Sequence, residues 1–263
     1  MVFLLNYLVL LLSVKYQSLS MNTSKAAIFA RLQKEILPLQ DSKKSLNNNA
    51  IDKTIGPLKN SFPNQTFPVG AIHEFIAAGM EDTATTTGFI ASILAPLMQN
   101  AGAVIWIGSF HAVFPPALKL FGLVPDKIIF INLQKETAML WAMEEALKCE
   151  GLAAVIGEIK ELSFTASRRL QLAVEQSRVT GFIIRTNPHT ITTTACFTRW
   201  KITALSSEME DGLPGVGFPR WNVDLLKVRN GTPGKWQIEF KAGCFRYIYK
   251  TAVIPQQLHQ KTG

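Results

Sequence analysis

Residues 77–93, AAGMEDTATTTGFIASI, have the spacing of a phosphate-binding loop. Such a loop follows the pattern G-x-x-x-x-G-K-[ST], in which backbone N–H groups wrap the phosphates, the lysine neutralises them and the hydroxyl holds Mg²⁺. Counted from Gly79, the pattern places Ala84 at the second glycine, Thr85 at the lysine and Thr86 at the hydroxyl. The spacing is therefore present, but the cation is missing.

Two acidic residues make this stretch still less suited to an anion. Glu81 and Asp82 add negative charge, which leaves only N–H groups at a helix start to attract a phosphate. Tight ATP binding is not expected. An ordinary strand-turn-helix junction, with threonines at the helix start, accounts for the same residues.

The surrounding chain predicts the sheet that would position this junction. Apolar stretches alternate with helical patterns, which predicts a mostly parallel sheet with helices on both faces. The predicted strands are 71–78, 103–108, 127–133, 152–158 and 181–185, and the predicted helices are 88–99, 115–122, 137–149 and 167–178. The stretches 198–206, 221–231 and 234–250 alternate at period two, so they predict an antiparallel C-terminal extension.

The ends of the chain predict smaller appendages. Residues 2–14 are apolar but shorter than the ~20 residues that span a bilayer, and no basic lead-in or cleavage site accompanies them. We therefore expect Met21 to be the start, with a membrane anchor as the alternative. The expected units are an extension at 1–20, an amphipathic helix at 21–40, a linker at 41–60, one domain at 61–250 and a tail at 251–263.

The composition of the chain restricts the possible classes of function but does not single one out. The chain of 263 residues is 48% hydrophobic and 17% charged, as in globular proteins. Its net charge of +8 arises mostly from residues 151–263, where 15 Lys and Arg face 8 Asp and Glu. Such a surface suits nucleic acid, an acidic protein or solvent alone. The 3 cysteines and 4 histidines are scattered, so we expect no metal, no disulfide framework and a cytoplasmic location.

Longer motifs carry a resemblance to a known family. WIGSFHAVFPPALKLFGLVPDKIIFI (106–131), FPVGAIHEF (67–75) and LLKVRNGTPGKWQIEF (225–240) resemble segments of RecA recombinases. The chain from Met21 is similar to the ImuA family, RecA-like accessory proteins of bacterial SOS mutagenesis cassettes, through GFIASIL, LWAMEEALKC, ELSFTASRRLQLAVEQS and DGLPGVGFPRWNVDLLKVRNG. The resemblance implies an α/β fold with a RecA-like core.

The resemblance also implies a second chemical loss. Phe110 stands where RecA has the glutamate that orients the attacking water, and an aromatic ring cannot do this work. Glu158 aligns near the position where the RecA family has the acidic residue that assists Mg²⁺. The alternative is a strand-end carboxylate bonded to local backbone. Thr186 aligns near the position where RecA has the glutamine that senses the γ-phosphate. We therefore expect no ATPase activity and no bound cofactor.

Two basic residues keep the RecA pattern. Lys227 and Arg229 lie where RecA carries residues that reach the ATP of a neighbouring subunit, and the i, i+2 spacing on a strand puts them on one face. The hypothesis is that this face docks on the end of a RecA filament. The predicted N-terminal helix, with Phe29 and Leu32 on its apolar side, would copy the interaction helix of RecA. Solvation of an exposed strand is the alternative role for the pair.

Direct contact with DNA is a weaker expectation. The stretches 159–165 and 186–194, equivalent to the DNA-binding loops of RecA, offer no aromatic and basic array for stacking bases. Six basic residues remain as candidates for weak, salt-dependent phosphate contacts, with a solvated face as the alternative. They are Arg168, Arg169, Arg178, Arg199, Lys201 and Arg220.

The resemblance implies a non-catalytic adaptor for error-prone translesion synthesis. Its implied partners are a Y-family-polymerase-like protein, a replicative-type error-prone polymerase subunit and RecA, with no membrane and with association to the nucleoid when acting. A divergent DNA-repair ATPase that binds ATP and Mg²⁺ is the alternative function.

Overall fold

The computed structural model describes residues 49–100, 102–108, 113–207 and 217–248. The expected extension at 1–20, the helix at 21–40 with Phe29 and Leu32, and the tail at 251–263 lie outside these residues. Phe110 lies outside them as well.

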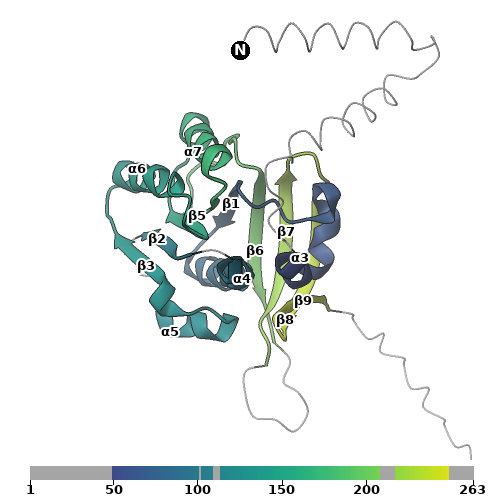
Figure 1. Cartoon of the computed structure of the whole chain (residues 1–263). Coiled ribbons are helices and arrows are strands. Elements are labelled where there is room, and N and C mark those ends of the chain that lie inside the picture. Colours follow the sequence, from purple (N-terminus) through teal and green to yellow (C-terminus); the bar gives the residue numbers. More distant parts are fainter. Residues whose placement is uncertain (1–48, 101, 109–112, 208–216, 249–263) are drawn as a thin grey trace, which may run out of the picture. The chain divides into compact units, whose positions relative to one another are not determined.

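The described residues form a nine-stranded sheet in the order β3-β2-β4-β5-β1-β6-β7-β8-β9 (Figure 1). The strands are β1 Ile72–Ala77, β2 Val104–Gly108, β3 Ile128–Asn132, β4 Ala154–Glu158, β5 Thr180–Thr186, β6 Thr198–Leu205, β7 Arg220–Val228, β8 Gly234–Lys241 and β9 Cys244–Tyr247. Pairing is parallel from β3 to β6 and antiparallel from β6 to β9. The predicted fold class is confirmed, with one correction: β6, expected within the antiparallel part, pairs parallel with β1.

Helices cover both faces of the sheet (Figure 1). On one face lie α3 (Asn49–Ile55) and α4 (Met80–Asn100), and on the other lie α6 (Glu136–Leu147) and α7 (Phe164–Ser177). The shorter elements are η1 Gly56–Ser61, η2 Pro63–Gln65, α5 Pro115–Leu118, η3 Lys119–Phe121 and η4 Pro125–Lys127. None of the helices in the described ranges is long and apolar enough to cross a membrane.

Each face has its own hydrophobic core. The α3 and α4 face is rich in aromatic rings: Phe75 stacks on Trp200 with centroids 6.1 Å apart, and Phe89 stacks on Phe245 at 4.9 Å. The α6 and α7 face is packed mainly with aliphatic side chains and methionines, such as Met143. Burial of apolar side chains on both faces is what lets consecutive parallel strands read as continuous apolar runs.

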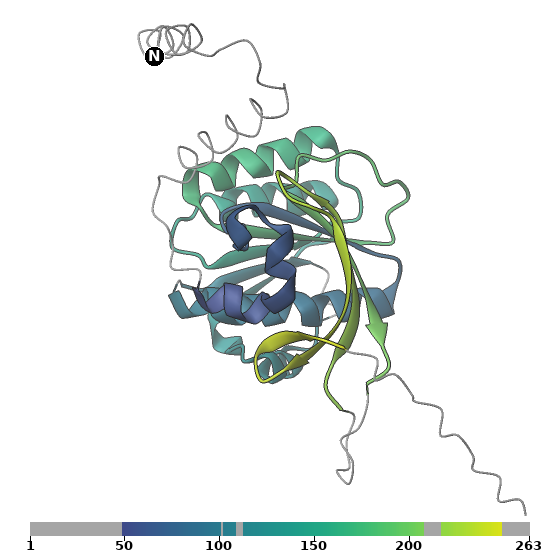
Figure 2. The ribbon, with the colours of Figure 1, turned by 90° about the vertical axis from the view of Figure 1, so that its right-hand side faces the viewer.

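Residues 49–60, which we expected to belong to the linker at 41–60, are helical and packed. Ile51, Ile55 and Leu58 are at most 3% exposed, because α3 and η1 lie against the curved antiparallel strands (Figure 2). Gly56 has φ +50°, and a Cβ there would overlap the backbone carbonyl of Phe245. The polar composition of the preceding residues hid this apolar face, so the domain begins earlier than the predicted residue 61.

The helix expected from residue 88 begins at Met80 instead. Glu81 and Asp82 lie in its first turn, where acidic residues interact favourably with the helix dipole. The same two carboxylates that made a phosphate site implausible therefore favour an early helix start.

Candidate functional site

The strand-to-helix junction has no phosphate-binding loop. β1 ends at Ala77 and α4 begins at Met80, so only Ala78 and Gly79 connect them. Ala84, Thr85 and Thr86 consequently lie inside α4 and not in a loop that could wrap a phosphate. Of the four positions aligned with the loop pattern, only Gly79 is non-helical.

The polar groups at this junction are bonded to one another. The Asp82 carboxylate accepts the Ala78 N–H at 3.1 Å, and the Thr83 hydroxyl donates to the Gly79 carbonyl at 2.7 Å. The Thr83 hydroxyl also lies 3.4 Å from that of Thr186, so the structure does bring the end of β5 to the junction. A carboxylate of the chain itself thus occupies the N–H group that would face an anion.

Thr86 cannot reach a ligand at the surface. Its side chain is fully buried, and its hydroxyl has no hydrogen-bond partner among the described residues. A hydroxyl that holds Mg²⁺ must instead open onto the nucleotide.

Glu158 lies at the end of β4 and accepts a hydrogen bond from the indole N–H of Trp106 at 2.9 Å. Gly108 on β2 lies so close that a Cβ there would be 2.5 Å from the Glu158 carboxyl carbon. This partner is therefore a side chain of the neighbouring strand β2, and not the local backbone that the sequence-based alternative named.

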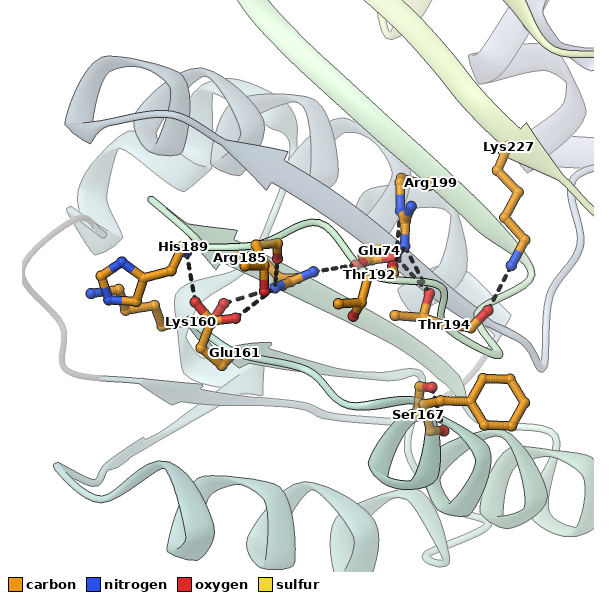
Figure 3. Close-up of polar contacts among 12 residues, drawn as sticks. Glu74, Lys160, Glu161, Ser167, Arg185, His189, Thr192, Thr194, Arg199 and Lys227 are labelled. Atoms are coloured by element: carbon orange, nitrogen blue, oxygen red, sulfur yellow. Dashed lines mark hydrogen bonds and ion pairs between the residues drawn. The ribbon is translucent and has the colours of Figure 1, made fainter.

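A buried ion cluster lies on the α7 face of the sheet (Figure 3). Arg185 of β5 is fully buried and donates from Nη1 to Glu74 of β1 at 3.0 Å and from Nη2 to Glu161 at 3.1 Å. Arg199 of β6 donates to the other Glu74 oxygen at 2.8 Å, and so does the hydroxyl of Thr194 at 2.7 Å. Every charge in the cluster is therefore paired, as burial requires.

Hydrogen bonds to and beside the cluster fix the segments 159–165 and 186–194, which the resemblance aligned with the DNA-binding loops of RecA. In the first, Glu136 accepts the N–H of Lys160 at 3.0 Å, and Arg185 donates to the Lys160 carbonyl at 3.1 Å. The first segment is also tied to the second, because Glu161 accepts the N–H of His189 at 2.6 Å. These bonds hold the two segments together at the carboxyl ends of β4 and β5.

Four basic side chains each hold a different carbonyl of the segment 187–197, which we call the clamped segment. The pairs are Arg185 with Thr190 at 2.8 Å, Arg199 with Thr192 at 2.6 Å, Lys227 with Thr194 at 2.7 Å and Arg229 with Ala195 at 2.9 Å. These bonds satisfy four backbone carbonyls of the clamped segment with side chains of its own chain.

Lys227 and Arg229 thus lie side by side, as their spacing predicted, but they contact their own chain. Burial lowers the pKa of Lys227, and the positive charge of Arg199 lowers it further. Arg229 also lies over the ring of Phe197 at 5.5 Å. Both side chains are half-buried, so part of each remains accessible.

The six candidate phosphate contacts do not form one array. Arg199 belongs to the buried cluster, Arg220 pairs with Glu239 at 2.8 Å, and Arg169 pairs with Glu144. Arg168 pairs with Glu175 at 3.9 Å, Arg178 ends α7 with φ 65°, and Lys201 is exposed on β6. They lie on several elements, namely α7 and its C-terminal cap, β6 and β7.

Sequence reasoning missed the central pair, Glu74 and Arg185. The available signal was a charge inside each of two apolar strands, in IHEFIA and TGFIIRT. Buried strands rarely hold charges unless these are paired, so two opposite charges in predicted parallel strands indicate a contact.

A pocket of about 230 Å³ lies between α6 and α7, away from the ion cluster residues. It is lined by Thr137, Leu140, Trp141, Glu144, Ala166, Arg169 and Leu170. Of the expected site residues, only Arg169 contributes to it. The described residues contain no group of three or more His, Cys, Asp or Glu that could hold a metal ion.

The fold and the site define a class: α/β proteins with a mostly parallel sheet, an antiparallel extension and a short strand-to-helix junction at the carboxyl edge. The chain is 32% identical to Protein ImuA of Caulobacter vibrioides over 190 residues, which are 68% of this chain and 78% of that protein. It belongs to the ImuA family.

Other comparisons are more distant. The chain is 32% identical over 100 residues to the cell division inhibitor SulA of Photorhabdus laumondii, covering 36% of this chain and 56% of that protein. The crystal structure of SulA from Pseudomonas aeruginosa matches 45% of this chain and 99% of its own, with 21% identity and a TM-score of 0.38. No family model matches.

Proposed function

We propose that this chain is a non-catalytic adaptor in SOS-induced, error-prone translesion synthesis. Membership of the ImuA family supports a role as an accessory protein of SOS-associated mutagenesis. The observation that carries the non-catalytic part is the junction at Ala78 and Gly79, because it provides neither a loop nor a lysine for a triphosphate.

Calorimetric titration with Mg-ATP tests this part. We expect no saturable binding. Micromolar affinity that Thr85→Val or Thr86→Val abolishes would instead favour the divergent ATPase.

The proposed partners are a Y-family-polymerase-like protein, a replicative-type error-prone polymerase subunit and RecA. The face that carries Lys227 and Arg229 is the candidate contact with RecA. Lys227 uses one of its three N–H donors on Thr194, and Arg229 uses one of its five on Ala195, so both keep donors for a partner.

Charge reversal tests the docking. Lys227→Glu with Arg229→Glu should abolish co-purification with RecA, whereas Lys201→Glu, at an exposed lysine on the neighbouring strand β6, should not. Such a loss has two explanations: the two side chains contact RecA, or their replacement releases the clamped segment. Hydrogen exchange of the clamped segment that is unchanged in the double variant excludes the second explanation. Unchanged co-purification of the double variant would end the docking proposal.

DNA contact through the six basic candidates, from Arg168 to Arg220, would be weak and salt-dependent. Fluorescence anisotropy with single-stranded DNA, from low to physiological salt, checks it. No binding even at low salt would remove DNA from the list of partners.

A further inference from the structure

Lys227 of β7 and Arg199 of β6 are like charges placed directly opposite each other. They are partners in the register of the antiparallel pair β6 and β7, so their side chains leave the sheet on the same face. Figure 3 shows both side chains directed toward the clamped segment, where they bond different carbonyls. Arg229 adds a third positive charge beside Lys227. Like charges opposite each other in a sheet are unfavourable, and the loss of a proton from Lys227 relieves this repulsion.

The positive charge of Lys227 has no carboxylate partner among the described residues. Its hydrogen-bond partner is the uncharged carbonyl of Thr194, at 2.7 Å. Glu74 of β1 is already bonded by Arg185 and Arg199. The ammonium form of Lys227 is therefore opposed by two cations and paired with no anion of its own.

This environment makes Lys227 a reactive amine. Burial lowers its pKa, and the charges of Arg199 and Arg229 lower it further. The Cys196 thiol supplies no compensating anion near neutral pH, because burial raises its pKa to about 12. A lowered pKa leaves more of the amine uncharged, and the uncharged amine is a nucleophile. The bond to Thr194 uses an N–H group, so the lone pair of the nitrogen stays available.

The two arginines suit an anionic reagent. Guanidinium groups bind phosphate through charge-assisted hydrogen bonds, and Arg229 uses one of its five donors on the Ala195 carbonyl. Lys227 and Arg229 are half-buried, so a small molecule has better access to the amine than a large one. These features favour a small acyl donor whose leaving group is a phosphate.

We propose that Lys227 is a modification site that takes its acyl group from an acyl phosphate. The amine attacks the carbonyl carbon, the bond from this carbon to the phosphate oxygen breaks, and the departing phosphate takes up the proton that the nitrogen loses. An amide replaces the amine, so the positive charge is lost. The reaction goes beyond the proposed function, because it needs only this chain and the donor, although it would remove one of the two charges proposed to contact RecA.

Acetyl phosphate tests the proposal on the full chain, with mass spectrometry of proteolytic peptides to follow each lysine. Lys201, on the neighbouring strand β6, is the internal control, because it is more exposed than Lys227. At neutral pH we expect acetylation of Lys227 to be about ten-fold faster than that of Lys201, the effect of one charge-assisted bond to the phosphate. A rate at Lys227 no higher than that at Lys201 would overturn the proposal.

A neutral donor and one variant separate phosphate recognition from the reactivity of the amine. With N-hydroxysuccinimidyl acetate the preference for Lys227 over Lys201 should shrink, and in urea it should disappear with either donor. Arg229→Gln should slow acetylation of Lys227 by acetyl phosphate about ten-fold and leave that of Lys201 unchanged. An equal preference with both donors, a preference that persists in urea, or an unchanged rate at Lys227 in Arg229→Gln would each overturn the proposal.

Discussion

On the α4 face of the sheet, buried aromatic rings such as Phe75, Phe89 and Trp200 contact one another, whereas the α7 face carries the cluster of Glu74, Arg185 and Arg199. Apolar contacts tolerate small changes of position, since they are non-directional. Loss of a member of the ion cluster is costly, because it removes a partner from a charge that remains buried. The two faces should therefore fail in different ways.

The largest expected effect comes from breaking the cluster. Arg185→Met leaves Glu74 fully buried with one cation partner instead of two, and we expect a loss of about 3 to 5 kcal/mol in the free energy of unfolding. Urea unfolding measures it. Adding Glu74→Gln should recover part of the loss, and a double variant no more stable than Arg185→Met alone would show that packing, not charge, dominates this face.

A buried histidine on the aromatic face gives the next effect. His73 lies between the rings of Phe67 and Phe182 and bonds Thr198 and Pro68, and burial lowers its pKa to about 4. Between pH 6.5 and 4 the unfolded chain therefore binds a proton that the folded chain does not. Stability should fall with falling pH in this window, by about 3 kcal/mol in total.

Unfolding curves of wild type and His73→Gln, measured from pH 7 to pH 4, isolate this contribution from those of the carboxylates. The difference in stability between the two proteins should shrink as the pH falls. A constant difference would contradict the lowered pKa.

A smaller effect, of opposite sign, is expected inside α4. Thr86→Val removes a buried hydroxyl without a hydrogen-bond partner among the described residues, so we expect a gain of about 1 kcal/mol. Thr85→Val, at a partly exposed position on the same helix, should give no gain. Thermal unfolding compares the two, and a destabilised Thr86→Val would indicate a partner for that hydroxyl.

The smallest effect concerns an exposed ion pair on the same face as the cluster. Arg169, whose side chain is 61% exposed, pairs with Glu144, and Arg169→Ala should cost at most about 1 kcal/mol, less at high salt. Urea unfolding at two salt concentrations measures it. If Arg169→Ala lowered the free energy of unfolding as much as Arg185→Met does, then the difference in burial between the Arg169–Glu144 and Arg185–Glu74 pairs would not determine their contributions to stability.

The sequence predicted the parallel sheet well, since apolar runs with polar breaks mark buried strands directly. It did not predict the start of α4 at Met80. The spacing of a phosphate-binding loop favoured a loop there, and Glu81 and Asp82 were considered only as charges that repel a phosphate, although acidic residues also favour a helix start. The contact between Glu74 and Arg185 joins residues 111 positions apart, so no local pattern contains it. The roles expected for Lys227 and Arg229 in a partner contact remain predictions, although their side-by-side placement is seen.

The connection through Ala78 and Gly79 bears on whether nucleotide binding could be engineered into this junction. A lysine substituted at position 85 would project from the second turn of α4, where no N–H groups encircle a phosphate. A phosphate-binding loop at this place would require insertion of several residues before Met80 and unwinding of the first turn of α4. A single substitution would therefore not create a nucleotide site here, because the backbone of the junction is too short to form the loop.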